Sequence, residues 1–192
     1  MLNYGEELAY WYLRFNGFFL IDNFVLHMSD SRLGRSSDSD LLGIRLPHVF
    51  EEIGGQANDW DEHLFGQIDG NKKICLICEV KTGGFDPDRI FSRNHLEKAV
   101  GRFGISPNFQ YHINEVSENA VTPIEDFLVV KVLFSRKKEN PREDCIHIKL
   151  NHVKNFLKRR LNKYIDRKFN DRMFFPSPLI QYMAWEESQK QN

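Results

Sequence analysis

Short apolar runs alternate along the chain with segments in which apolar residues recur at helical spacing. The runs are bounded by glycine, proline and short polar residues, which is typical of β-strands. They predict strands at about 18–27, from residue 40, at 73–81, at 127–134 and at 145–149. Helices are predicted at about 3–16, from Asp86-Pro87 to near Gly104, and within 149–172. A chain of 192 residues is expected to form one domain with a sizeable core.

The strand at 73–81 ends with a carboxylate and a lysine two residues apart, Glu79 and Lys81. Alternate residues of a strand point to the same face, so these two side chains should project together, with Cys78 and Val80 facing the other way. Phosphodiester cleavage needs a carboxylate to hold a divalent ion and a cation to orient or activate the attacking water. The pair therefore suits half of a metal-dependent nuclease site, although exposed strand edges often carry the same residue types.

Two further motifs precede this pair. Gly5-Glu6-Glu7-Leu8-Ala9 opens the first predicted helix, and Asp40-Leu41-Leu42 leads into the second predicted strand. Together with Glu79-Val80-Lys81-Thr82-Gly83, their order resembles the PD-(D/E)XK nuclease superfamily. The resemblance is nearest to archaeal Holliday-junction resolvases and to a small bacterial endonuclease-like family, and it covers roughly the first half of the chain.

The resemblance implies a fold, a chemistry and a set of roles. The fold is α/β, with a restriction-endonuclease-like core in which helices flank a central mixed sheet. Asp40 and Glu79 correspond to metal ligands, together with the backbone carbonyl of Val80, and Lys81 corresponds to the catalytic lysine. Glu6 corresponds to a helix-borne acid that supports the metal site. The implied activity is endonucleolytic hydrolysis of DNA, with Mg²⁺ or Mn²⁺ as the cofactor.

Other interpretations of these residues stay open. Glu6 also suits a helix N-terminus, where a carboxylate complements the helix dipole. Asp40 also suits a turn at the entry to a strand. Asp38 lies two positions earlier on the same strand face and is an alternative ligand. Asp40 is preferred because the apolar strand begins immediately after it.

An acidic insertion separates the two ligand strands. Asp40 and Glu79 are 39 residues apart, which is more than a simple hairpin needs. Residues 47–71 carry six acidic and no basic residues, a net charge of −6. The acidic residues are Glu51, Glu52, Asp59, Asp61, Glu62 and Asp69. Because such a segment would repel phosphates, we expect a solvated excursion that points away from the DNA groove.

The basic residues gather in other segments. Residues 149–172 hold nine basic and two acidic residues, a net charge of +7, and their apolar residues recur at helical spacing. This predicts an amphipathic helix whose basic face contacts the phosphate backbone. A solvated face, or a counter-surface for the acidic insertion, is the alternative. The predicted DNA contacts are Arg32 and Arg35 in a polar loop, Arg93, and Lys158, Arg159, Lys163 and Arg167 on the basic helix.

The helix after the Glu79 strand is where relatives often place a glutamine or a basic residue. Arg93, Lys98 and Arg102 are the candidates on it, and none forms a convincing fourth motif. We divide the chain into a nuclease-like domain at 1–150 and a basic helix with an apolar tail at 151–192 that packs on the core.

Composition adds little about partners but excludes several classes. The net charge of −1 gives no global attraction to nucleic acid. Three cysteines make a disulfide framework improbable, and Cys75 and Cys78 suit core positions on opposite faces of a strand. No segment approaches the roughly 18 apolar residues of a membrane span. Without the features of a signal peptide at the start, we expect a cytoplasmic protein that has no membrane partner.

Two other classes of function compete with the nuclease. One is a catalytically silent nucleic-acid-binding module, and the other is a protein-interaction domain that uses the acidic insertion and the apolar tail. A homodimer is a further expectation, because cutting both strands of a duplex usually needs two active sites.

Overall fold

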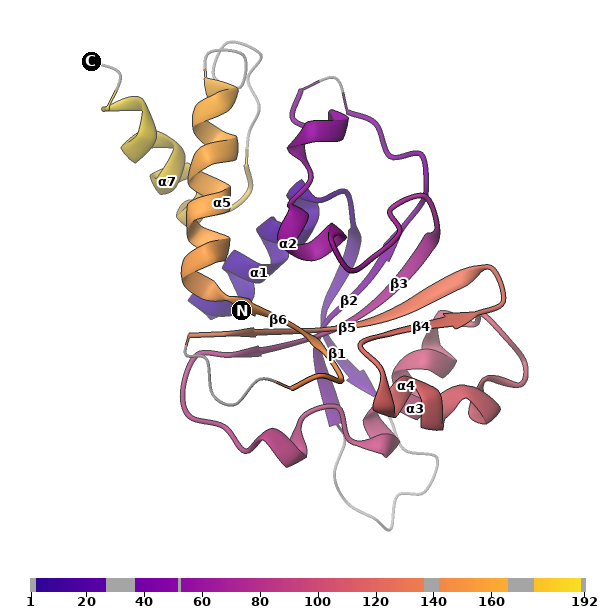
Figure 1. Cartoon of the computed structure of the whole chain (residues 1–192). Helices are drawn as coiled ribbons and strands as arrows, with labels where there is room; N and C mark the ends of the chain where they lie inside the picture. The colour runs from indigo at the N-terminus through magenta and orange to yellow at the C-terminus, as the bar shows by residue number, and fades with distance from the viewer. Residues whose placement is uncertain (1–2, 27–36, 52, 137–141, 166–174, 191–192) are drawn as a thin grey trace.

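A central β-sheet with helices on both faces forms the protein (Figure 1). The computed structural model describes residues 3–26, 37–51, 53–136, 142–165 and 175–190. Within these ranges the sheet has six strands. They are β1 (Phe19–Leu26), β2 (Ser37–Arg45), β3 (Lys73–Lys81), β4 (Val121–Ile124), β5 (Phe127–Ser135) and β6 (Ile146–Lys149). The predicted α/β class with a mixed sheet is confirmed.

The strands are arranged in the order β1-β2-β3-β5-β4, and β6 also pairs with β5. Strands β1, β2 and β3 are antiparallel neighbours, whereas β3 and β5 are parallel. Strand β4 pairs with the first half of β5 and β6 with its second half. The carboxyl ends of β3, β5 and β6 therefore meet at one edge of the sheet.

Two hydrophobic cores lie on opposite faces of the sheet. Helices α1 (Tyr4–Phe15), α5 (Leu150–Lys163) and α7 (Pro178–Ser188) pack on one face. Helices α3 (Arg93–Phe103) and α4 (Ile113–Glu118) pack on the other, which we call the α3 face. Cys78 belongs to the first core and Cys75 to the second, as predicted, and both thiols are free. Burial on both faces explains why β3 reads as a continuous apolar run.

The element boundaries agree with the sequence in some places and differ in others. Strand β3 has the predicted limits, but β2 begins at Ser37, so Asp40 lies inside a strand. The helix predicted from Asp86-Pro87 is wrong at its start. Asp86 caps only the short 3-10 turn η3 (Pro87–Arg89), and α3 begins at Arg93 after the N-cap Ser92. The helix ends at Phe103, and its C-cap residue Gly104 has a left-handed φ of 64°.

The acidic insertion is not the solvated excursion that we expected. It contains the 3-10 turn η2 (Ala57–Asp59) and the short helix α2 (Glu62–Phe65), and Leu64 and Ile68 are part of the core beneath α1 and α5. Asp59 and Asp61 are buried. The Asp61 carboxylate accepts hydrogen bonds from Tyr12 Oη (2.8 Å) and lies 2.6 Å from His152 Nε2. Partners that lie far away in the sequence therefore offset the free-energy cost of burying a charge here.

Helices α5 and α7 at the C-terminal end of the described chain pack on the core. Helix α5 presents Val153, Phe156, Leu157 and Leu161 to the core. The apolar tail forms α7, which buries Ile180, Met183 and Ala184 in the same cluster. Among the described residues, no helix is long and apolar enough to span a membrane.

Candidate functional site

Two strands bring the predicted catalytic residues together. Leu41 of β2 lies opposite Cys78 of β3 in the last registered pair, so the next position along places Asp40 beside Glu79. Cys78 and Val80 point into the core beneath α1, which leaves Glu79 and Lys81 on the α3 face. The expected alternation along β3 is therefore confirmed. The antiparallel pairing of β2 and β3 brings Asp40 and Glu79 together, although they are 39 residues apart in the sequence.

Asp40, Glu79 and Lys81 form a single charged cluster. The ammonium Nζ of Lys81 lies 2.6 Å from Glu79 Oε2 and 3.3 Å from Asp40 Oδ2. The backbone N–H of Val80 donates to the same Asp40 oxygen at 2.7 Å. One cation therefore bridges two carboxylates, and a backbone donor fixes the orientation of Asp40. The side chain of Asp38, the alternative ligand, lies outside the described part of the structure.

Burial controls the electrostatics of this cluster. The Glu79 side chain is only 8% exposed, and loss of solvation raises the pKa of its carboxyl to about 7, although Lys81 acts in the opposite direction. Burial alone would lower the pKa of Lys81, but the two carboxylates outweigh burial and raise it. Lys81 therefore stays charged, while Glu79 is a carboxylate that a further cation would stabilise.

The donors suit a magnesium-like ion better than a closed protein cage. Among the described residues, no group of three or more histidine, cysteine or acidic side chains is placed to hold a metal. Mg²⁺ usually binds one or two carboxylates and keeps several of its waters. Asp40 and Glu79 supply two carboxylates of which one is deeply buried, and this fits such an ion. The ligand role of the Val80 carbonyl stays a prediction.

Glu6 lies near this edge of the sheet but uses its carboxylate elsewhere. The first turn of α1 approaches the end of β3 so closely that a Cβ on Gly5 would lie 2.3 Å from Thr82 Cγ2. The Glu6 carboxylate accepts the backbone N–H of Asn3 at 3.1 Å, and the Asn3 side chain accepts the N–H of Glu6. This capping box matches the alternative interpretation of Glu6 as a helix-start residue. Its support of a metal site stays a prediction.

The structure adds a buried histidine that the sequence did not reveal. His95, in the first turn of α3, places Nδ1 3.4 Å from Glu79 Oε1. Burial lowers the pKa of His95 to about 4, so its imidazole is neutral at pH 7. The sequence candidates for a fourth motif on this helix are Arg93, Lys98 and Arg102, and His95 is not among them. A single histidine beside the apolar Leu96 does not form a sequence pattern that indicates a site.

A second polar pair extends the site across the neighbouring strands. Ser135 lies opposite Lys81 in the parallel β3–β5 ladder. Its Oγ is 2.7 Å from Nε2 of His147 on β6. Sequence reasoning missed both residues because each is a single polar position in or next to an apolar strand.

The basic helix is largely paired with the protein's own acids. Lys163 Nζ lies 2.7 Å from Asp59 Oδ1 of the insertion. Lys158 pairs with Glu186 of α7 and lies 3.6 Å from Glu187 Oε1. The Lys163 contact matches the alternative of a counter-surface for the acidic insertion, whereas Lys158 pairs with acids of α7.

The remaining predicted DNA contacts fall into three groups. Arg159 is exposed on α5. Arg93 donates to the side chain of Asn114. Arg32, Arg35 and Arg167 lie outside the described residues.

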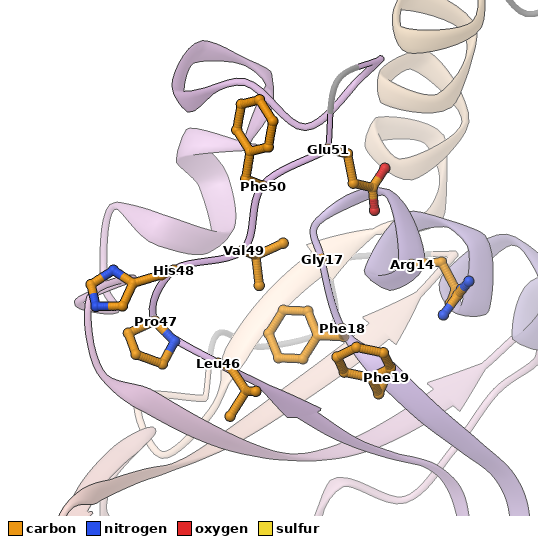
Figure 2. A pocket seen from close by; sticks show the side chains of 10 residues that line it. All are labelled: Arg14, Gly17, Phe18, Phe19, Leu46, Pro47, His48, Val49, Phe50 and Glu51. Carbon is orange, nitrogen blue, oxygen red and sulfur yellow. The ribbon is translucent and has the colours of Figure 1, made fainter.

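An apolar hollow of about 580 Å³ opens where β1 begins, between the start of that strand and the insertion (Figure 2). Phe19 and Phe50 border it and are 63% and 71% exposed. Leu46 and Val49 also line it, and Arg14 and Glu51 contribute charges of opposite sign. In Figure 2 the Val49 side chain points toward the Phe18 ring, and the Phe50 side chain points away from that ring. Exposed apolar patches of this kind are typical of interaction surfaces in other proteins.

Comparison with protein-family models, with curated proteins and with solved structures finds no match for this chain. The assignment of a function therefore depends on the geometry of the site.

Proposed function

We propose that this protein is a metal-dependent endonuclease of the PD-(D/E)XK type that hydrolyses DNA phosphodiester bonds. The observation that supports it is the cluster in which Lys81 bridges Asp40 and the buried Glu79. Two carboxylates and one lysine converging at a sheet edge supply the charges that phosphodiester hydrolysis requires. A structural ion pair could use the same residue types and also shift pKa values, so the cleavage experiment below separates the two.

Each residue has a distinct role in this proposal. Asp40 and Glu79 would hold Mg²⁺ or Mn²⁺ together with the Val80 carbonyl. When bound, the ion polarises a phosphoryl oxygen and lowers the pKa of a bound water. Lys81 orients the attacking water or stabilises the charge that develops on the phosphate. Glu6 supports the site from the start of α1.

Cleavage of supercoiled plasmid and of branched DNA with Mg²⁺ or Mn²⁺ tests the proposal. We expect the wild-type protein to cut and Glu79→Gln to be inactive while it remains folded. Glu118→Gln is the matched control, because Glu118 is exposed on α4. Full activity of Glu79→Gln would reject the assigned site. DNA binding without cleavage by the wild-type protein would favour the catalytically silent module.

Parts of the surfaces first considered for protein interaction are engaged internally, because Leu64 and Ile68 of the insertion and Ile180 and Met183 of the tail pack on the core. The apolar hollow is a better candidate, and we propose that a second copy of the chain occupies it. Its rim carries one cation and one anion, Arg14 and Glu51, so two copies related by a two-fold axis can pair opposite charges. Among the described strands, β1 is an edge of the sheet beside this hollow.

Sedimentation velocity over a range of concentrations tests this contact. We expect a dimer for the wild-type chain and a monomer for Phe50→Glu. Tyr111→Glu should remain dimeric, because Tyr111 is also an exposed aromatic residue but lies outside the hollow. A monomeric wild-type protein at every concentration would reject the second copy as the occupant.

A further inference from the structure

His95 is held against the least exposed carboxylate of the site. The helix that carries it starts at Arg93, and the Ser92 side chain caps that start by accepting the His95 N–H. This hydrogen bond fixes the backbone of His95 in the first turn of the helix. The imidazole Nδ1 lies 3.4 Å from Glu79 Oε1, and both side chains are almost completely buried.

The two oxygens of Glu79 consequently face different partners. Oε2 lies against the ammonium of Lys81, whereas Oε1 faces His95. The ionised carboxylate only accepts hydrogen bonds, so a neutral imidazole with its hydrogen on Nδ1 presents a donor to Oε1. Each oxygen of the carboxylate therefore has its own polar neighbour, Lys81 for Oε2 and His95 for Oε1.

Burial of the other ring nitrogen of His95 costs free energy, because that nitrogen has no hydrogen-bond partner in the part of the chain that the structure describes. His95 Nε2 is a buried atom that has no hydrogen-bond partner among the described residues. A leucine or phenylalanine would fill the same space beside Phe91 without leaving a buried polar atom unpaired. The contact with Glu79 is the interaction that a histidine provides here and an apolar residue does not.

We propose that His95 is a positioning residue that fixes the carboxylate of Glu79 for binding a divalent cation. This inference rests on the proposed function, because it assigns Glu79 to the cation. His95 does not contact the cation in this arrangement; it acts through Glu79. Residues that orient a ligand in this way typically change metal affinity by about 10–100-fold when they are removed.

Binding of Mn²⁺ to the whole chain without DNA, followed by electron paramagnetic resonance, is the primary measurement. We expect His95→Leu to weaken Mn²⁺ binding by about 10-fold or more. His95→Asn keeps a donor near the Nδ1 position and should recover most of the affinity. His112→Leu is the control, because His112 is partly exposed at the N-cap of α4 and lies outside both proposed sites. In cleavage assays, His95→Leu should need more Mn²⁺ at an unchanged KM for DNA.

The outcomes separate the inference from the function on which it rests. Unchanged Mn²⁺ affinity in His95→Leu would overturn the positioning role. Equal losses in His95→Leu and His95→Asn, each with a lower melting temperature, would also overturn it and assign His95 to the fold. A wild-type protein that binds Mn²⁺ but cuts no DNA rejects the nuclease, while the affinity series still decides the role of His95. A wild-type protein that binds no Mn²⁺ rejects both.

Discussion

Individual residues at the sheet edge show how burial and pairing together create a chemical site. Glu79 alone would be costly to bury as an anion, and Lys81 alone would be costly to bury as a cation. Placed 2.6 Å apart, they stabilise each other, and the carboxyl of Glu79 still has a pKa raised to about 7. Asp40 joins them through a different strand, with its orientation fixed by the N–H of Val80. Contacts within the chain itself therefore hold the cluster together.

The ligand role of Asp40 gives a prediction at this scale. Asp40→Asn keeps the acceptor for the Val80 N–H but removes the negative charge, so we expect cleavage to fall by at least about 100-fold with little change in folding. Asp38→Asn should retain activity. Rates measured with plasmid DNA and Mg²⁺ decide between the two, and the opposite ranking would move the ligand two residues upstream.

At the scale of elements, the acidic insertion and the basic helix are complementary. Asp59 accepts hydrogen bonds from Lys163 Nζ (2.7 Å) and Tyr164 Oη (2.5 Å). Arg160 donates to the backbone carbonyl of Asp59, and to that of Phe15 on α1 at 3.2 Å. Charges of −6 and +7 that look like separate binding surfaces in the sequence partly neutralise each other in the fold.

This pairing predicts a dependence of stability on pH. Burial alone would raise the pKa of Asp59, but the hydrogen bonds from Lys163 and Tyr164 outweigh burial and lower it. A lowered pKa stabilises the folded state above the unfolded pKa of about 3.9, and this stability is lost as the pH falls through the folded value. Asp59→Asn should lower the free energy of unfolding by about 1–3 kcal/mol at pH 7.

Urea denaturation at several pH values measures this effect. The difference between Asp59→Asn and the wild-type chain should be constant from pH 7 to 5 and should shrink below about pH 4. Glu125→Gln, an exposed acid at the β4–β5 turn, is the control. A difference that persists unchanged in acid would contradict the assigned cause.

DNA contact by α5 is a separate prediction, and exposure now distinguishes its residues. Arg159 is exposed, so Arg159→Gln should weaken DNA binding for all sequences and flatten the salt dependence by close to one unit. Lys163→Gln should leave DNA affinity unchanged and reduce stability, because its ammonium is paired with Asp59. Fluorescence anisotropy over a salt series separates them. If both variants weakened DNA binding equally, the whole basic face of α5 would have to contact DNA.

At the scale of the whole molecule, buried polar links join segments that are far apart in the chain. Tyr12 of α1 and His152 of α5 both contact Asp61 of the insertion beneath the same face of the sheet. Burial, followed by the charge of Asp61, raises the pKa of Tyr12, so its hydroxyl remains a donor. The network ties the insertion to the two helices that cover the first core.

Removing one hydroxyl tests this link. Tyr12→Phe leaves Asp61 buried without one of its donors and should lower the free energy of unfolding by about 1–3 kcal/mol. Tyr4→Phe, at an exposed position of the same helix, should change it by less than about 0.5 kcal/mol. Thermal and urea unfolding measure both variants. DNA cleavage by Tyr12→Phe should match the wild-type rate, because Tyr12 lies on the other face of the sheet from Glu79 and Lys81.

The sequence by itself determined the features that depend on near neighbours. The limits of β3, the opposite burial of Cys75 and Cys78, and the shared face of Glu79 and Lys81 all follow from the two-residue repeat of a strand. The apolar stripes of α3 and α5 follow in the same way from helical spacing. Local geometry fixes these properties, so a single sequence carries them.

Only the tertiary structure decided which distant groups meet. Lys163 and Asp59 are 104 positions apart, and neither residue carries a local signal of the other. His95 reaches Glu79 because it lies on the buried face of α3, in the first turn after the N-cap Ser92, and this face packs on the sheet. Burial of a charge depends on the partners that surround it in the folded chain. For that reason the sequence misplaced the acidic insertion and gave no sign of His95.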